Sequence, residues 1–284
     1  MKTVSILAYN RQAYLKRVLE ALAVCRGIRN YHVVVSLDNA PYEQPTWEVA
    51  QWFKEKFTHY RVWKNMDRQG VDLHPKLVYG ELFSGPLQST FNVVFEDDIV
   101  PSPDALELCD WFYHLPDRDQ YACLLLHGAT KDQSHSLQVN EFMRFCPWGW
   151  AFTRSAWEDI FRPEWNAKPP TPSGGTGWDW SCGLTIQRHA LKCLVPVLSR
   201  TLNIGREGGV YESPDHWDAW AKDLVASDGT HGKDYFIGDR LRPGYENDVD
   251  PWVTEAKRME APAHLGKDVH MAEDRAEAIR RPYE

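Results

Sequence analysis

The sequence contains no run of about 20 apolar residues, so it offers no candidate for a membrane-spanning helix. It also lacks a secretory signal at its start, where Met1 and Lys2 lead directly into an apolar run over residues 3–8. Its six cysteines form no CxxC pair, which argues against a zinc site or a redox motif and favours reduced, buried thiols. We therefore expect a cytoplasmic protein.

Several catalytic signatures and a basic charge excess are missing as well. The sequence has no GxSxG, GxxxxGK[ST] or HExxH motif, and no GxGxxG after a strand. Its 32 Lys and Arg against 40 Asp and Glu give a net charge of −8, which argues mildly against wholesale binding to nucleic acid. It is rich instead in aromatic residues, with 13 Trp and 12 Tyr. Such rings suit a core, an interface or a site that stacks on sugars or bases.

Apolar runs typical of buried strands alternate with helical patterns over the first half of the chain. Strand candidates cover residues 3–8, 31–37, 61–64, 91–95, 121–126 and, later, 193–198. Leu15, Val18, Leu19 and Leu22 recur at the spacing of an amphipathic helix. This alternation predicts an α/β fold with a mostly parallel central sheet flanked by helices.

A chain of 284 residues suits one large domain or two small ones, and no clear linker interrupts it. We expect a single domain over residues 1–250. Its regular half runs to about residue 125 and its irregular half from 126 to 250. A polar tail should follow over 251–284, with one helix near 270–281.

Polar side chains follow three of the predicted strands. They are Asn10-Arg11, Asp38 and the acidic triplet Glu96-Asp97-Asp98. In parallel sheets, ligands bind beyond the carboxyl ends of the strands. The triplet therefore predicts either a Mg²⁺ or Mn²⁺ site that holds a diphosphate, or a solvated turn before the helix that should begin at Ser102 and Pro103.

Asp179 lies between two tryptophans, directly after a segment rich in Pro and Gly over residues 163–177. A carboxylate partly walled by rings can have a raised pKa and act as a general base. The alternative is a carboxylate that only complements the start of a helix.

Two further segments have a functional and a structural interpretation. Trp148-Gly149-Trp150 fits a platform for a saccharide or a corner of the aromatic core. Arg200 and Arg206 flank a segment that could close over phosphates, or they form surface ion pairs.

Taken in order, these motifs resemble a known family. The set is AYNR (8–11), VSLD (35–38), VVFEDD (93–98), PWGW (147–150), GWDW (177–180) and SRTLNIGREGG (199–209). Over roughly residues 3–215 it resembles the inverting GT-A glycosyltransferases of the N-acetylglucosaminyltransferase I type. The resemblance implies a Rossmann-like GT-A fold and metal-dependent transfer of a sugar, GlcNAc above all, from a UDP-sugar to an acceptor hydroxyl.

The resemblance also assigns roles to the donor side. Arg11 and Asp38 would hold the nucleotide, together with Tyr9 and Asn10 of the first motif and with His74 near the uridine. The triplet corresponds to the DxD motif of the family. Asp98 would bind Mn²⁺ or Mg²⁺, while Glu96 and Asp97 would face the sugar and the ribose.

On the acceptor side, Asp179 corresponds to the catalytic base. Arg200 and Arg206 belong to a segment that resembles a loop ordered over the bound donor. The acceptor or sugar platform would comprise Trp148, Gly149, Trp150 and Trp178.

The acceptor itself stays open at this point. A glycan or a lipid-linked sugar is the default expectation. A hydroxymethylated base in bacteriophage-type DNA is an alternative for an enzyme without an anchor, and it would require access to the base. A non-catalytic module that binds nucleotide sugars is the third hypothesis, and the presence of both Asp98 and Asp179 argues against it. The sequence does not predict the oligomeric state.

Overall fold

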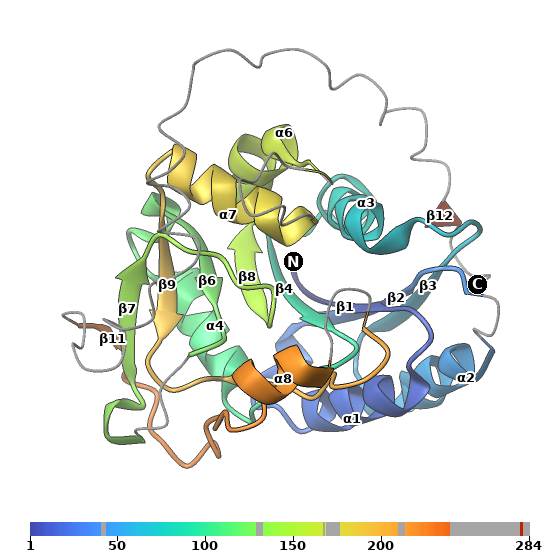
Figure 1. Cartoon of the computed structure of the whole chain (residues 1–284), viewed down its shortest axis with the longest axis horizontal. Coiled ribbons are helices and arrows are strands. Elements are labelled where there is room, and N and C mark those ends of the chain that lie inside the picture. The colour runs from blue at the N-terminus through green and yellow to red at the C-terminus, as the bar shows by residue number, and fades with distance from the viewer. Residues whose placement is uncertain are drawn as a thin grey trace.

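The computed structural model describes residues 1–40, 44–128, 133–166, 168, 177–209, 214–238 and 279–280. Within these residues, a ten-stranded sheet with the order β11-β7-β9-β6-β8-β4-β1-β2-β3-β12 lies between two layers of helices (Figure 1). Strands β5 and β10 pair separately. The strands are β1 (Lys2–Ala8), β2 (His32–Leu37), β3 (Tyr60–Asn65), β4 (Phe91–Glu96), β5 (Ile99–Pro101), β6 (Tyr121–Leu125), β7 (Gln138–Phe142), β8 (Trp150–Thr153), β9 (Lys192–Pro196), β10 (Thr201–Asn203), β11 (Phe236–Ile237) and β12 (Ile279–Arg280).

The helical segments connect these strands. The α-helices are α1 (Gln12–Ala23), α2 (Gln44–Trp52), α3 (Gly70–Ser84), α4 (Ala105–His114), α5 (Arg154–Ala156), α6 (Arg162–Glu164), α7 (Trp178–Arg188) and α8 (Pro214–Trp220). A π-helical turn, η5 (Trp157–Phe161), joins α5 to α6. Short 3₁₀ turns are η1 (Ile28–Asn30), η2 (Phe53–Lys56), η3 (Arg118–Gln120) and η4 (Gln133–His135).

The parallel part of the sheet is built around β1. Strand β1 pairs in parallel with β2 and with β4, and β2 pairs in parallel with β3. The carboxyl ends of these strands therefore meet at one edge of the sheet. The mixed part begins at β8, which runs antiparallel to both β4 and β6. The expected α/β architecture is confirmed.

The alternating side chains of β1 explain why helices cover both faces. Val4 and Ile6 pack in one core with apolar residues of α1, α2 and α4, whereas Leu7 packs in a second core with residues of α3, α7 and η5. Figure 1 shows α1 and α2 on one side of the sheet and α3 and α7 on the other. Burial of both faces agrees with the largely apolar composition of these strands, which also contain buried polar residues such as Thr3, Ser5 and Asn92.

Some expected elements differ in the structure. Strands β7 and β8 have no counterpart among the strands expected from the sequence. Helix α4 begins at Ala105 rather than at Ser102 and Pro103. Ser102 lies before the helix, where its Oγ donates to Asp104 Oδ1 (2.7 Å). Most of the segment 163–177 lies outside the described residues, since 167 and 169–176 are not described. The helix expected near 270–281 also lies outside them, except that Ile279 and Arg280 form β12.

Two further expectations concern membrane helices and thiols. No helix in the described ranges is long and apolar enough to cross a membrane. All six cysteines are free thiols, and five are buried while Cys146 is partly exposed.

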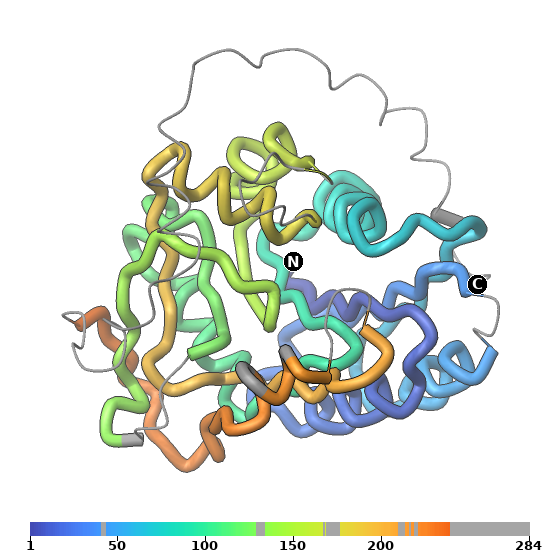
Figure 2. The backbone as a smooth tube through the Cα atoms, in the orientation of Figure 1, coloured from blue at the N-terminus to red at the C-terminus, as the bar shows by residue number. Residues whose placement is uncertain are grey.

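The antiparallel pair β5–β10 brings a late segment of the chain to the edge of the sheet. Thr201 pairs with Pro101, and Asn203 pairs with Ile99. Figure 2 shows the segment after β10 returning towards α1, where the Glu207 amide donates to Tyr14 Oη (3.4 Å). The segment from β10 to Glu207 therefore lies beside the edge of the sheet at which β1, β2 and β4 end.

Candidate active site

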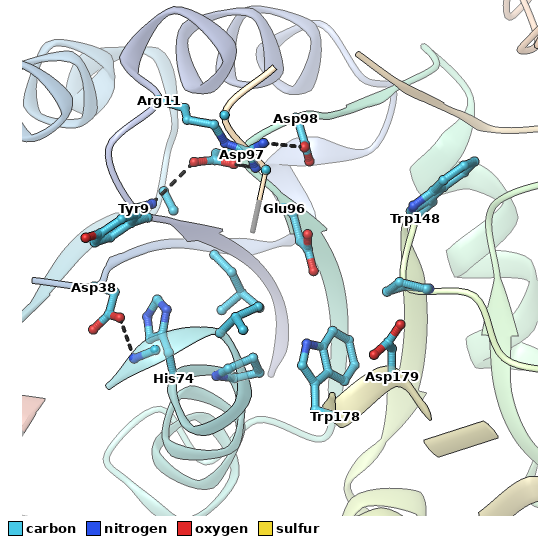
Figure 3. A pocket seen from close by; sticks show the side chains of 18 of the residues that line it. Tyr9, Arg11, Asp38, His74, Glu96, Asp97, Asp98, Trp148, Trp178 and Asp179 are labelled. Atoms are coloured by element: carbon cyan, nitrogen blue, oxygen red, sulfur yellow. Dashed lines mark hydrogen bonds and ion pairs between the residues drawn. The ribbon is translucent and has the colours of Figure 1, made fainter. Parts of the chain in front are cut away.

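A pocket of about 210 Å³ opens at the carboxyl ends of β1, β2 and β4. Its lining includes ten of the residues expected from the sequence: Tyr9, Arg11, Asp38, His74, Glu96, Asp97, Asp98, Trp148, Trp178 and Asp179. Figure 3 shows Asp38 and His74 at one end of this pocket and Trp148, Trp178 and Asp179 at the other, with Glu96 between them. The pocket thus joins the two groups of residues to which the sequence resemblance assigns donor and acceptor roles.

Arg11 ties together the strand ends at the top of the pocket. It lies three residues after the end of β1, at the start of α1. Its guanidinium forms ion pairs with Asp97 and, from Nη1 to Oδ2 at 2.8 Å, with Asp98. The Tyr9 amide also donates to Asp97 Oδ2 (3.3 Å). A guanidinium can bridge two carboxylates because its donors form a planar fork.

Asp38 organises the opposite end of the pocket. Its Oδ1 accepts hydrogen bonds from Asn65 Nδ2 (3.0 Å) and from the Gln69 amide (2.8 Å), and its Oδ2 accepts from the Gly70 amide (2.7 Å). These bonds fix the turn at which α3 begins. Because these hydrogen bonds hold the buried Asp38 carboxylate in one orientation, it forms a rigid part of the pocket lining.

His74 lies in α3 beside this part of the lining, and its Nε2 is 2.8 Å from Ser36 Oγ. Burial lowers the pKa of His74 to about 4, although the nearby Asp38 acts in the opposite direction. The ring is therefore neutral at pH 7, so it offers one donor and one acceptor rather than a positive charge.

Arg68 is a pocket residue that the sequence reasoning missed. Its guanidinium carbon lies 4.9 Å from the centroid of the Tyr9 ring, in the geometry of a cation–π contact. Within the described part of the chain, this exposed guanidinium has no carboxylate partner. Arg68 lies in a polar turn that contains no recognisable motif, so the local sequence does not mark it as a pocket residue.

The acidic triplet lies at the centre of the pocket. Burial raises the pKa of Asp97 to about 6 and also raises the pKa of Asp98, and Arg11 opposes both shifts. Burial and the carboxylates of Asp98, Asp97 and Asp179 raise the pKa of Glu96 well above its ordinary value. Gathered carboxylates of this kind favour the approach of a cation.

Asp98 has the surroundings of a cation ligand. Its Oδ1 is buried and has no hydrogen-bond partner. The segment after β10 passes very close to it: the Ile204 amide donates to the Asp98 carbonyl (2.9 Å), and a β-carbon at Gly205 would lie 1.9 Å from Asp98 Oδ2. Only glycine fits at position 205 without displacing this carboxylate.

The described residues contain no group of three or more His, Cys, Asp or Glu side chains arranged to hold a metal ion. A divalent ion such as Mg²⁺ or Mn²⁺ is often bound by one or two carboxylates together with substrate phosphates and water. The orphaned Oδ1 of Asp98 beside an open pocket fits such a ligand set, in which the protein supplies few of the ligands.

Asp179 stands in the first turn of α7 and faces the pocket. Burial raises the pKa of its carboxyl to about 6, against the backbone N–H groups of Trp180 and Asp179, which lower it. The carboxylate of Asp72 adds to the rise. A carboxylate with a pKa near 6 is ionised at neutral pH and is a stronger base than an ordinary aspartate.

The tryptophans expected to form one platform have different surroundings. Trp148 is partly exposed, lines the pocket and contacts the His127 ring edge-on (4.9 Å between centroids). Trp178 is buried apart from the part that lines the pocket, and its ring stacks on Trp165 (5.4 Å). Trp148 is the one of these rings with both pocket contact and free surface.

Trp150 and Gly149 do not form part of the platform in this structure. Trp150 is fully buried and stacks on Phe152 (4.2 Å between centroids), because both side chains project from β8 into the second core. Gly149 has φ of 92°, and a β-carbon there would lie 2.7 Å from Thr201 Cγ2. Its small size therefore serves close packing against β10 rather than a ligand.

The two arginines of the segment 199–209 also lie outside the pocket. Arg200 is fully buried, forms an ion pair with Asp104 (2.9 Å) and donates to the Leu198 and Ser136 carbonyl groups. Arg206 forms two hydrogen bonds with Asp218 of α8 (2.9 and 3.0 Å). Both hold the late segment in place, and neither contacts the space expected for phosphates.

Asn10 is exposed and does not line the pocket, although both of its neighbours do. In contrast, Asn203 at the end of β10 and the glycines Gly208 and Gly209 contribute to the lining. The segment 199–209 thus reaches the pocket through small and neutral residues, whereas the sequence pattern favoured its charged side chains.

Comparison with known proteins shows which solved structures have a similar fold. No protein-family model matches the chain. Among solved structures, Staphylococcus aureus TarS 1–349 in complex with UDP-GlcNAc is 17% identical over 77% of this chain and 64% of that chain, with a TM-score of 0.54. The same TarS fragment in complex with UDP is 15% identical over 71% of this chain and 59% of that chain, with a TM-score of 0.50.

The chain thus spans about three fifths of the length of these TarS chains. At such identities the likeness concerns the fold alone, and it confirms the expected fold class: a mixed α/β architecture with a Rossmann-like central sheet flanked by helices. Membership of the N-acetylglucosaminyltransferase I type family stays a prediction.

Proposed function

We propose that this protein is a glycosyltransferase that moves a sugar, GlcNAc above all, from a UDP-sugar to an acceptor hydroxyl with inversion at the anomeric carbon. One observation carries the proposal: two guanidinium groups and an acidic cluster at the donor end, and a carboxylate base at the other end, face the same 210 Å³ pocket. A module that only binds nucleotides has no use for Asp179 at the far end of that pocket.

The donor end supplies the groups that a nucleoside diphosphate requires. Arg11 and Arg68 are guanidinium groups at the pocket, and guanidinium binds phosphate oxygens through paired hydrogen bonds. Asp38 and neutral His74 would contact the nucleoside beside α3, with Tyr9 as a neighbouring ring. The fold shared with TarS, a protein solved in complex with UDP-GlcNAc, supports this donor.

Asp98 would hold the metal ion of the reaction through its orphaned Oδ1. Mn²⁺ or Mg²⁺, when bound, offsets the negative charge of the departing UDP. Glu96 lies between the metal side and Asp179, where it would face the transferred sugar (Figure 3).

Asp179 acts as the general base in this proposal. It takes the proton of the acceptor hydroxyl as that oxygen forms a bond to the anomeric carbon, and the bond from this carbon to the UDP oxygen breaks with its electron pair leaving on UDP. A single displacement of this kind inverts the configuration. The partly exposed ring of Trp148, which lines the same pocket as Asp179, provides a flat apolar surface for a sugar acceptor, either a glycan or a lipid-linked sugar.

Two measurements test the proposal. In a screen of nucleotide sugars with Mn²⁺, the correct donor should raise the melting temperature by binding to the folded state. Asp179→Asn should retain this shift but lose transfer, by about 100-fold or more. Asp159→Asn, which changes an exposed aspartate of η5 away from the pocket, is the matched control and should transfer sugar normally. Transfer at the wild-type rate by Asp179→Asn would refute the assignment of the base.

A further inference from the structure

The start of α7 is capped by a residue from another helix. Gly177, which precedes α7, adopts φ of 119° and offers no side chain to the free N–H groups of the first turn. Asp72, in the first turn of α3, fills this role: its Oδ1 accepts a hydrogen bond from the Trp178 amide (3.1 Å). The Asp72 carbonyl also accepts from Trp165 Nε1 (3.0 Å). Asp72 therefore joins α3 to the helix that carries Asp179.

Two carboxylates lie at the start of α7. The Trp178 amide donates to Asp72, while the backbone N–H groups of Asp179 and Trp180 lower the pKa of the Asp179 carboxyl. The Asp179 side chain points into the pocket, as Figure 3 shows. Two negative charges at one helix terminus repel each other, so the Asp72 carboxylate raises the pKa of Asp179.

We propose that Asp72 is a positioning residue for Asp179: it ties the start of α7 to α3 and sets a second negative charge beside the proposed base. The base role itself rests on the proposed function. Asp72 does not line the pocket, so it acts through Asp179 and not on the substrate.

Other groups around Asp179 also influence its pKa, so the Asp72 charge accounts for only part of the rise. Glu96 of β4 interacts with it across the pocket, and two thiols lie close by, the buried Cys182 in α7 and the partly exposed Cys146 before β8. Burial is the largest cause of the raised pKa of Asp179, and the Asp72 carboxylate acts in addition to it. Removal of the Asp72 charge should thus lower the pKa of Asp179 only in part.

The test is Asp72→Asn, in which the amide oxygen still accepts from Trp178 but the charge is gone. The carboxyl titration of Asp179, followed by ¹³C NMR, should move down by about 0.5 pH unit. The acidic limb of the pH profile of kcat/KM should move by the same amount, while UDP affinity should not change. Asp72→Glu should restore the wild-type titration, and Asp159→Asn should leave it unchanged.

A second neutral variant, Asp72→Ser, guards against a folding defect specific to Asn and should give the same shift. An unchanged Asp179 titration in a folded neutral variant would overturn the proposal and leave Asp72 with a purely structural role. The NMR titration requires no sugar transfer, so the role of Asp72 and the proposed function can be refuted independently of each other. A shifted titration in a protein that transfers no sugar would refute the proposed function and keep the coupling of Asp72 to Asp179.

Discussion

Arg11 Nη1 lies 2.8 Å from Asp98 Oδ2, so the loop between β1 and α1 is ion-paired with the last carboxylate of the acidic triplet at the end of β4. The same guanidinium pairs with Asp97. Arg11 is therefore a cation that compensates the clustered acids, and the pKa values of Asp97, Asp98 and Glu96 remain raised even with Arg11 in place.

Arg11→Ala should weaken UDP binding by about 10- to 100-fold, as expected for the loss of a charged hydrogen bond to a phosphate. Arg11→Lys should recover little of this affinity, because an ammonium cannot bridge two carboxylates as a fork. Calorimetric titration with UDP measures both effects. Arg17→Ala, an exposed arginine on α1, is the control, and equal affinities for Arg11→Ala and Arg17→Ala would contradict the role of Arg11.

Gly205→Ala should displace the Asp98 carboxylate, since the new β-carbon would lie 1.9 Å from Oδ2. We expect the stabilisation by Mn²⁺ plus UDP, measured as a shift in melting temperature, to be lost while the protein remains folded. Gly80→Ala on α3 is the matched control, because nothing lies within 4 Å of the added carbon and alanine favours a helix by about 0.5–1 kcal/mol. A normal shift for Gly205→Ala would show that Asp98 does not bind the ion.

Trp148 and Trp150 are separated by a single residue but should respond differently to alanine. Trp150→Ala removes a fully buried ring and should cost about 3–5 kcal/mol of unfolding free energy in urea denaturation. Trp148→Ala should have a smaller effect on stability and should raise the KM for the acceptor, because its partly exposed ring lines the pocket. Equal losses of stability would remove the distinction between core and platform.

Arg200→Met should destabilise the protein without weakening the donor. It leaves Asp104 buried without its ion-pair partner, which costs about 3–5 kcal/mol in similar cases. Urea unfolding measures the loss, and UDP affinity in the folded protein should match that of the wild type because Arg200 lies outside the pocket. A loss of UDP affinity larger than tenfold would contradict this prediction and support a role for Arg200 in donor binding.

The raised pKa of Asp179 has a consequence for stability. The folded protein binds the proton of this carboxyl more tightly than the unfolded chain does, so its contribution to stability is complete below pH 4 and is lost as the pH rises through about 6. Asp179→Asn removes this dependence. The variant should match the wild type near pH 4 and exceed its unfolding free energy by about 1–2 kcal/mol at pH 7.5. Parallel stability curves from pH 4 to 7.5 would contradict a raised pKa.

Local patterns in the sequence predicted the parallel half of the sheet and the edge of the pocket. Strands such as β1 and β4 are rich in apolar residues and buried on both faces, and the polar residues that follow them, Arg11 and Asp98, must then lie at one edge. This relation needs only the order of strands along the chain, which the sequence displays directly.

The remainder depends on pairings between distant segments. Strand β8 is inserted antiparallel between β4 and β6, and the local sequence could not decide whether Trp150 belongs to the core or to a platform. Likewise, Arg200 has the same local appearance as a phosphate ligand, and only the fold supplies its partner Asp104. Arg68 and Asp72 carry no motif, so their places beside Tyr9 and Trp178 emerge only in three dimensions.

The β5–β10 ladder has a consequence for the order in which the site can be assembled. The triplet and its strand are synthesised early, but the glycine that packs on Asp98 follows about 100 residues later, so this wall forms only when a long chain loop has closed. Binding of the donor should thus be among the last properties gained during folding. An excised fragment of residues 1–125 would lack one side of its own pocket.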